Sequence, residues 1–73
     1  MTSDEITKAM GGTLKALRKR RTLTQQELAD RAGFTRTWIA QLEAGHADPP
    51  LSTLLKLAKA LGVSVAALVG GSR

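Results

Sequence analysis

Residues 24–45, TQQELADRAGFTRTWIAQLEAG, carry the pattern that decides the fold of this chain. Thr24 is followed three residues later by Glu27, which predicts a capping box in which each side chain bonds the other residue's backbone N–H. Gly33 is typical of the left-handed residue that ends a helix. Thr35 can cap a second helix, which a further glycine ends in the same way. The stretch therefore predicts two short helices joined by a tight turn.

The apolar residues of this stretch lie at helical spacing, so each predicted helix has one face for a core. Leu28 and Ala32 share a face of the first helix, and Ile39 and Leu42 share a face of the second. Ala29 is small enough to let the two backbones cross closely. Two helices that cross steeply through a short turn make a helix-turn-helix.

The stretch and its flanks resemble the Cro and phage-repressor (Xre-type) helix-turn-helix family. No single residue is diagnostic, and the ordered combination is what makes the resemblance specific. It covers about residues 10–69. The resemblance implies an all-α fold, a compact five-helix lambda-repressor-like DNA-binding domain. The residues that carry it are LTQQELA at 23–29, Gly33, Thr35, Ile39, EAG at 43–45, Pro49 and LLKLAKALGVS at 54–64.

The remaining sequence adds three predicted helices around this motif, so residues 1–73 form one domain. Ser3 is a suitable N-cap for a first helix with apolar residues at helical spacing. Gly11 and Gly12 weaken that helix, so its first turns either fray or precede a helix that begins near Gly12. After the motif, two adjacent prolines separate it from a leucine-rich helix. We expect helices at 4–21, 25–32, 36–44, 51–61 and 65–69, followed by a flexible tail at 70–73.

Composition limits the classes of function. The chain has 11 basic and 6 acidic residues and a formal net charge of +5. Residues 1–36 hold eight basic and four acidic groups, so most of the surplus lies there and favours an anionic partner. There is no cysteine, no secretory signal and no apolar run of about 20 residues that could span a membrane. We expect a cytoplasmic protein without a membrane partner.

The outer face of the second motif helix carries the predicted base contacts. Its inner face is apolar, so Thr37 and Gln41 lie on the opposite side and Arg36 lies at the helix start. The major groove admits a helix, and there Gln matches adenine, Arg matches guanine and Thr meets a thymine methyl. Outside such a motif, polar residues on a helix face are more often only solvated. Within it, we expect Arg36, Thr37 and Gln41 to read bases.

Phosphate contacts are expected around that helix. Residues 15–21 hold five cations, which either complement the negative end of the first helix or meet phosphate; beside the motif, we favour phosphate for some of them. The family also binds phosphate at the start of the first motif helix. In the loop after the second motif helix, His46 can bind a phosphate, whereas Asp48 would repel one. The residues expected on the DNA backbone are Gln25, Gln26, Lys19, Arg20, Thr35 and His46.

Other residues are expected to be structural. The resemblance implies an ion pair between Arg18 and Glu43 that ties the first helix to the second motif helix. Phe34, in the turn, is expected to fill the core. Trp38 lies at the flank of the inner face, where partial burial is favoured over contact with DNA.

Dimerisation is expected because a single helix can read only a short stretch of DNA. One recognition helix contacts only a few base pairs, and family members pair around a two-fold axis on inverted half-sites. We expect a homodimer formed through the last predicted helix and the residues that lead into it, with Leu51 as a further candidate for the interface. The alternative is that these residues only close the core. The predicted interface residues are Val63, Val65, Leu68 and Val69.

The predicted function is therefore that of a homodimeric, sequence-specific regulator of double-stranded DNA, with a repressor favoured. The competing interpretation is an antitoxin-type or other protein-binding helix-turn-helix module, with a toxin or co-regulator as partner and DNA binding as secondary autoregulation. A third is a DNA-binding fragment of a longer regulator. No catalytic constellation is recognisable, so we expect neither an enzyme nor a cofactor. A lone histidine without cysteine ligands predicts no metal site.

Overall fold

Five α-helices account for most of residues 2–70, the part of the chain that the computed structural model describes, and no strand occurs in that range. The helices agree with the predicted ones to within one residue at each end, and Gly70, expected in the tail, instead ends the last helix. The rest of the expected tail, 71–73, lies outside the described residues. No helix in the described range is long and apolar enough to cross a membrane. The helices are α1 (Ser3–Arg20), α2 (Gln25–Ala32), α3 (Arg36–Glu43), α4 (Leu51–Leu61) and α5 (Val65–Gly70).

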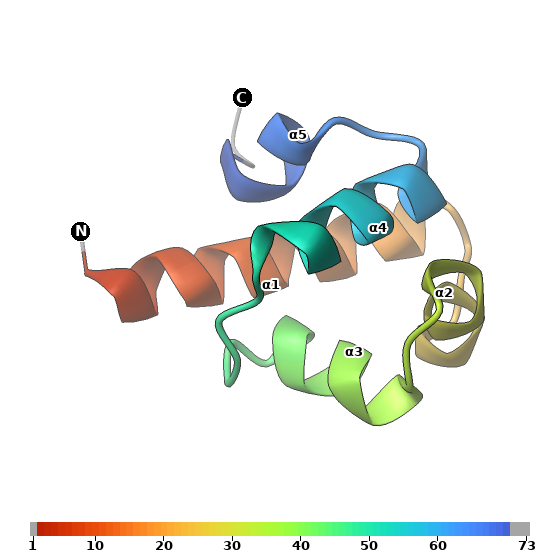
Figure 1. Cartoon of the computed structure of the whole chain (residues 1–73), viewed down its shortest axis with the longest axis horizontal. Helices are drawn as coiled ribbons and strands as arrows, with labels where there is room; N and C mark the ends of the chain where they lie inside the picture. The colour runs from red at the N-terminus through yellow and green to blue at the C-terminus, as the bar shows by residue number, and fades with distance from the viewer. Residues whose placement is uncertain (1, 71–73) are drawn as a thin grey trace.

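The longest helix, α1, runs through the length of the molecule and separates α3 from α5 (Figure 1). It contacts α3 on one side and α5 on another, while α2 packs against both α3 and α4. This arrangement holds α3 at the edge of the molecule, where one of its faces meets the core and the other meets solvent.

The predicted capping box of α2 is present. The Thr24 hydroxyl accepts a hydrogen bond from the Glu27 backbone N–H at 3.0 Å, and the Glu27 carboxylate accepts one from the Thr24 N–H at 2.8 Å. The N-cap of α1 is Thr2 rather than Ser3, and the prediction was wrong by one residue. The reason is that Glu5 lies three residues after Thr2, so only Thr2 can form the same reciprocal pair.

Gly11 and Gly12 do not interrupt α1, which is continuous through both. Gly11 is buried against the end of α3: a Cβ atom at this position would overlap the Leu42 carbonyl oxygen and lie 2.8 Å from that of Glu43. A Cβ atom at Gly12 would meet nothing within 4 Å. Gly11 therefore lets two helix backbones approach each other, which offsets its weak helix propensity.

The hydrophobic core draws on all five helices. Phe34 and Trp38 are partly buried against it, in line with the partial burial favoured for the tryptophan. Leu68, which the sequence suggested for a dimer interface, is part of this core and has no exposed surface. That prediction was wrong because α5 turns its single leucine inward, toward α1 and α4. The large side chains with less than 2% exposure are Leu14, Leu28, Ile39, Leu42, Leu57, Leu61 and Leu68.

Candidate nucleic-acid interface

The turn between α2 and α3 sets the direction of α3. Gly33 adopts a left-handed conformation with φ of 80°, and the next backbone N–H, that of Phe34, donates to the Ala29 carbonyl oxygen at 2.8 Å. The Thr35 hydroxyl then caps α3 by accepting from the Trp38 N–H at 3.1 Å. Because Ala29 is completely buried, the two helices cross closely. The local sequence thus holds α3 at a steep angle to α2, as in a helix-turn-helix.

The face of α3 that points away from the core is polar. Arg36, Thr37 and Gln41 are exposed, whereas Ile39 and Leu42 are fully buried on the opposite face. The three predicted base-reading residues therefore share one accessible surface at the start and the middle of the helix. Such a surface offers a guanidinium, a hydroxyl with its methyl group, and an amide, which suit the donors, acceptors and methyl groups of a major groove.

The end of α3 is held by the ion pair that the resemblance implied. Arg18 donates from Nε to Glu43 Oε2 at 2.6 Å and from Nη2 to Glu43 Oε1 at 3.0 Å. Its Nη1 also donates to the Leu23 carbonyl oxygen at 2.7 Å. The two side chains are only 9% and 4% exposed. The hydrogen bonds to Glu43 raise the pKa of Arg18 against the opposing effect of burial. The pair joins α1 to α3.

Gln25 belongs to the same network. Its Nε2 donates to Glu43 Oε1 at 3.1 Å, and the side chain is half-buried. An amide nitrogen carries two N–H donors, so one remains for the phosphate contact that the sequence suggested. The neighbouring Gln26 is exposed and donates to Asp30 Oδ1 at 2.8 Å along the surface of α2. The start of α2 is therefore fixed to the end of α3, a link that the sequence analysis missed.

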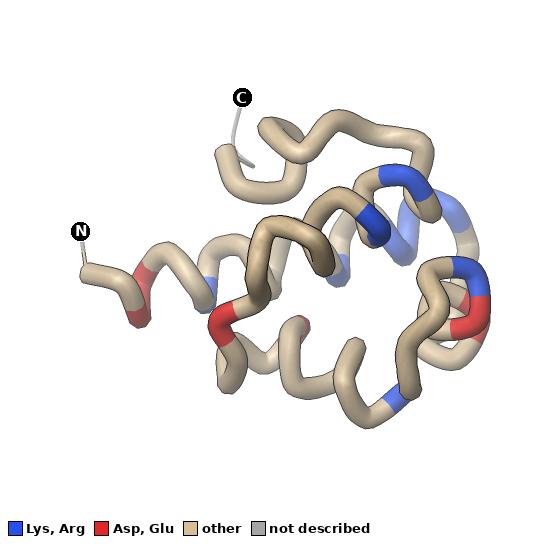
Figure 2. Tube along the Cα trace, in the orientation of Figure 1, with Lys and Arg blue, Asp and Glu red and all other residues tan. Residues whose placement is uncertain are grey.

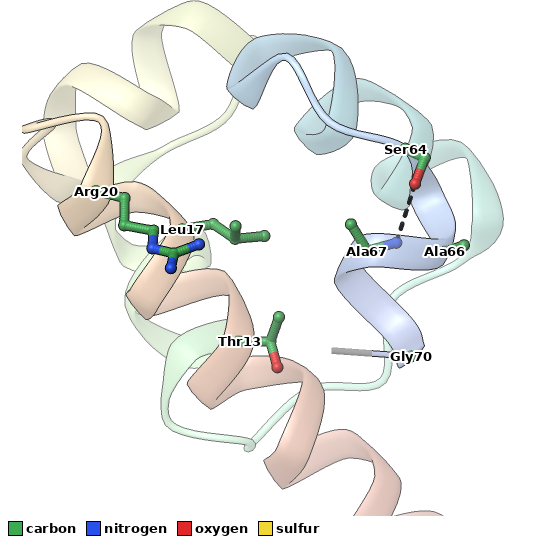
Figure 3. A pocket seen from close by; sticks show the side chains of 7 residues that line it. All are labelled: Thr13, Leu17, Arg20, Ser64, Ala66, Ala67 and Gly70. Carbon is green, nitrogen blue, oxygen red and sulfur yellow. Dashed lines mark hydrogen bonds between the residues drawn. The ribbon is translucent and has the colours of Figure 1, made fainter. Parts of the chain in front are cut away.

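Two neighbouring cations at the end of α1 are placed differently. Figure 2 shows Lys and Arg gathered at this end of α1 and on the second half of α4, rather than around α3 alone. Arg20 lines a hollow of about 440 Å³ between α1 and α5, together with Leu17 and Ala67 (Figure 3). Since α5 and α3 lie on different sides of α1, Arg20 is not part of the surface around α3. Arg20 is therefore no longer expected to contact the DNA backbone beside α3.

Lys19 keeps its place among the candidate phosphate contacts. It is exposed and follows Arg18, whose side chain points to α3. Successive residues of an α-helix are about 100° apart around the axis, so Lys19 leaves α1 beside α3 whereas Arg20 leaves it on the far side. Thr35 and His46 are also exposed, at the start of α3 and just after its end.

Lys8 is a further cation at this surface that the sequence analysis did not select. A Cβ atom on Gly45 would lie 2.7 Å from Lys8 Cγ and 3.0 Å from its Cα, so Lys8 packs directly on the turn that follows α3. The side chain is otherwise exposed, and it brings a positive charge to the loop that carries His46 and Asp48. No local pattern points to it, because the contact joins residues far apart in the chain.

Comparisons with known proteins agree with this geometry. A helix-turn-helix family model matches residues 14–68. The immunity repressor protein of Bacillus phage phi105 is 46% identical over 61 residues, which are 84% of this chain but only 42% of that protein. The crystal structure of the restriction-modification controller protein C.AhdI from Aeromonas hydrophila superposes with a TM-score of 0.83 at 31% identity, covering 88% of this chain and 96% of that one. The P22 c2 repressor, crystallised with a synthetic operator, superposes with a TM-score of 0.81 at 33% identity and covers 86% and 96%.

Proposed function

Because this chain belongs to the Cro- and phage-repressor-type (Xre) helix-turn-helix family of DNA-binding regulators, we propose that it is a homodimeric repressor that recognises an inverted repeat in double-stranded DNA. The proposal depends mainly on the exposed polar face of α3, a helix whose opposite face and C-terminal end are both fixed to the rest of the fold. Ile39 and Leu42 fix the inner face in the core. The ion pair between Arg18 and Glu43 fixes the end.

In this proposal α3 enters the major groove and reads bases from its outer face. Arg36 donates two hydrogen bonds to a guanine, Gln41 pairs with an adenine, and the Thr37 methyl group contacts a thymine. A rigidly held helix supports such reading, since small displacements would break bidentate hydrogen bonds.

Phosphates are held on either side of the groove. The start of α2 presents free backbone N–H groups and the second N–H of the Gln25 amide to one strand. Gln26, Thr35 and Lys19 extend that contact. Beyond the other end of α3, the positive charge of Lys8 offsets the negative charge of Asp48, and His46 donates a hydrogen bond to phosphate. These contacts set the position of the protein on the duplex and carry no sequence information by themselves.

The first experiment is selection of bound duplexes from a randomised DNA pool at near-physiological salt. We expect enrichment of an inverted repeat whose half-sites lie about 10 base pairs apart. If no sequence is enriched and binding disappears as salt is raised, only phosphate attraction is left and the proposal is wrong.

Three substitutions then separate the roles. Arg36→Ala should weaken binding to the selected DNA by about 1–3 kcal/mol and relax specificity, with little effect on random DNA. Lys19→Ala should weaken binding to both DNAs and reduce the salt slope by about 1. Arg20→Ala is the matched control: it removes the same charge one residue along α1 but on the side that faces α5, so its effect should be smaller on both DNAs. Equal losses on selected and random DNA for Arg36→Ala would contradict its reading role.

A further inference from the structure

The hollow between α1 and α5 has no part in the proposed reading of DNA. Its volume is about 440 Å³, and small-molecule sites typically measure about 300–1,000 Å³. Helix α1 lies between this hollow and α3, so a molecule bound in the hollow leaves the outer face of α3 uncovered (Figure 1). The side chains that line the hollow include Thr13, Leu17, Arg20, Ser64 and Ala67.

The middle of the hollow is apolar. Leu17 extends from α1 toward Ala67 of α5 (Figure 3). Both residues are only half-buried, so a ligand that covers them removes further apolar surface from water. A cavity of about 150 Å³ holds benzene. The hollow, at about 440 Å³, therefore has room for a ligand with an aliphatic chain of several carbons.

Arg20 brings the only charged side chain among the described residues that line the hollow. Figure 3 shows its guanidinium beside Leu17, at one side of the hollow. No carboxylate among residues 2–70 forms an ion pair with Arg20. A guanidinium presents several N–H donors in one plane and can bind a carboxylate through two of them. Arg20 therefore favours an anionic ligand, and a carboxylate matches its geometry.

The two hydroxyl groups at the hollow are in different hydrogen-bonding states. Ser64 Oγ accepts from the Ala67 N–H at 3.1 Å and keeps its own hydrogen as a donor. The Thr13 hydroxyl already donates to the Ala9 carbonyl oxygen at 3.0 Å. The hydrogen-bond donors left for a ligand are therefore those of Arg20 and of the Ser64 hydroxyl, which again suits a ligand rich in acceptors.

We propose that the hollow between α1 and α5 binds a small amphipathic carboxylate. Its carboxylate group pairs with Arg20, and its aliphatic chain covers Leu17 and Ala67. The ligand thereby bridges α1 and α5, and it can be bound at the same time as DNA because α3 lies on the other side of α1. Such a site does not depend on how α3 reads bases.

The test is a titration of the full, isotope-labelled chain with octanoate, followed through the amide signals in NMR spectra. We expect saturable shifts of the residues that line the hollow, with a dissociation constant on the order of 1 mM or below. Signals from the outer face of α3 should stay in place.

The role of the charge is tested with octanamide, which has the same chain and no charge. Octanamide should bind the wild type about tenfold more weakly than octanoate. Arg20→Gln should weaken octanoate binding by about tenfold and leave octanamide binding nearly unchanged.

Lys15→Gln is the matched control. It also removes one positive charge from an exposed position of α1. Since successive residues of a helix are about 100° apart, Lys15 lies about opposite Thr13 around the helix axis and points away from the hollow. Its affinity for octanoate should be close to that of the wild type.

Four results would overturn the proposal. Octanoate that gives no saturable shift at millimolar concentrations excludes the site, and shifts gathered at another surface place the binding elsewhere. Equal affinities of the wild type for octanoate and octanamide exclude the pairing with Arg20. Equal losses in Arg20→Gln and Lys15→Gln show attraction by net charge alone.

The outcome is separable from that of the proposed function, because octanoate binding is measured without DNA. A chain that binds octanoate in the hollow but enriches no DNA sequence supports the site and contradicts the proposed function. A chain that enriches an inverted repeat but does not bind octanoate excludes the site and leaves the reading of DNA in place.

Discussion

The contact between α1 and α3 can be tested by adding one methyl group at each of two adjacent glycines. In Gly11→Ala the new Cβ atom would overlap the Leu42 carbonyl oxygen and lie 2.8 Å from that of Glu43. Ordinary contacts begin at 3.4 Å, so the two helices would have to separate by about 0.6 Å or more at this point. In Gly12→Ala the same atom meets nothing within 4 Å.

The two substitutions should therefore change stability in opposite directions. Alanine improves helix propensity by up to about 1 kcal/mol at either position. At Gly11 this gain is outweighed by overpacking, which costs about 1–3 kcal/mol, and by distortion of the buried hydrogen bonds between Arg18 and Glu43. We expect Gly11→Ala to lose about 2 kcal/mol and Gly12→Ala to gain up to about 1 kcal/mol. For a domain of this size, each kcal/mol corresponds to a shift of about 4–8 °C in Tm.

Thermal and urea unfolding, followed by circular dichroism, measure both variants under the same conditions. The expected result is a Tm below that of the wild type for Gly11→Ala and above it for Gly12→Ala. Two alanine variants that both raise Tm by similar amounts would refute the close approach of α1 to the end of α3. A loss of stability in both would show instead that α1 does not continue through the two glycines.

Three further predictions follow from the helix ends and the ion pair. Thr22 is the one non-glycine residue with positive φ, 56°, among those described, so Thr22→Gly should raise the free energy of unfolding by about 1 kcal/mol and Thr22→Ala by less; urea curves showing a loss for Thr22→Gly would contradict the strain. The hydrogen bond from the Thr24 N–H lowers the pKa of Glu27, so the ionised carboxylate stabilises the fold above its ordinary pKa of 4.5, and this stabilisation is lost as pH falls through the lowered pKa. Glu27→Gln should therefore make Tm fall less steeply as the solution is acidified. An unchanged fall of Tm would count against the capping box. Arg18→Met and Glu43→Gln, made in the Gly12→Ala background, should each cost about 3–5 kcal/mol, with the double variant costing less than both together; additive losses in urea unfolding would exclude coupling.

The sequence alone determined the helices and the turn of this protein. The capping box at Thr24 and Glu27 and the glycine stop at Gly33 act within three or four residues, and they are found where the pattern predicted them. The apolar spacing of α3 likewise determined which of its faces is buried and which is exposed. The ion pair between Arg18 and Glu43 was reached through family resemblance rather than from local chemistry.

Only the tertiary structure decided which side chains are buried in the core and which are exposed at the surface. Leu68 is buried while Leu51 is exposed, although both are leucines within helices, because burial depends on which neighbouring helix covers each face. The close approach at Gly11, the direction of Arg20 and the contact of Lys8 with Gly45 have the same origin. Each depends on the packing of segments that are distant in sequence, as does the bond from Gln25 to Glu43, 18 residues away. Local propensity acts over a single helical turn and therefore carries no information about such contacts.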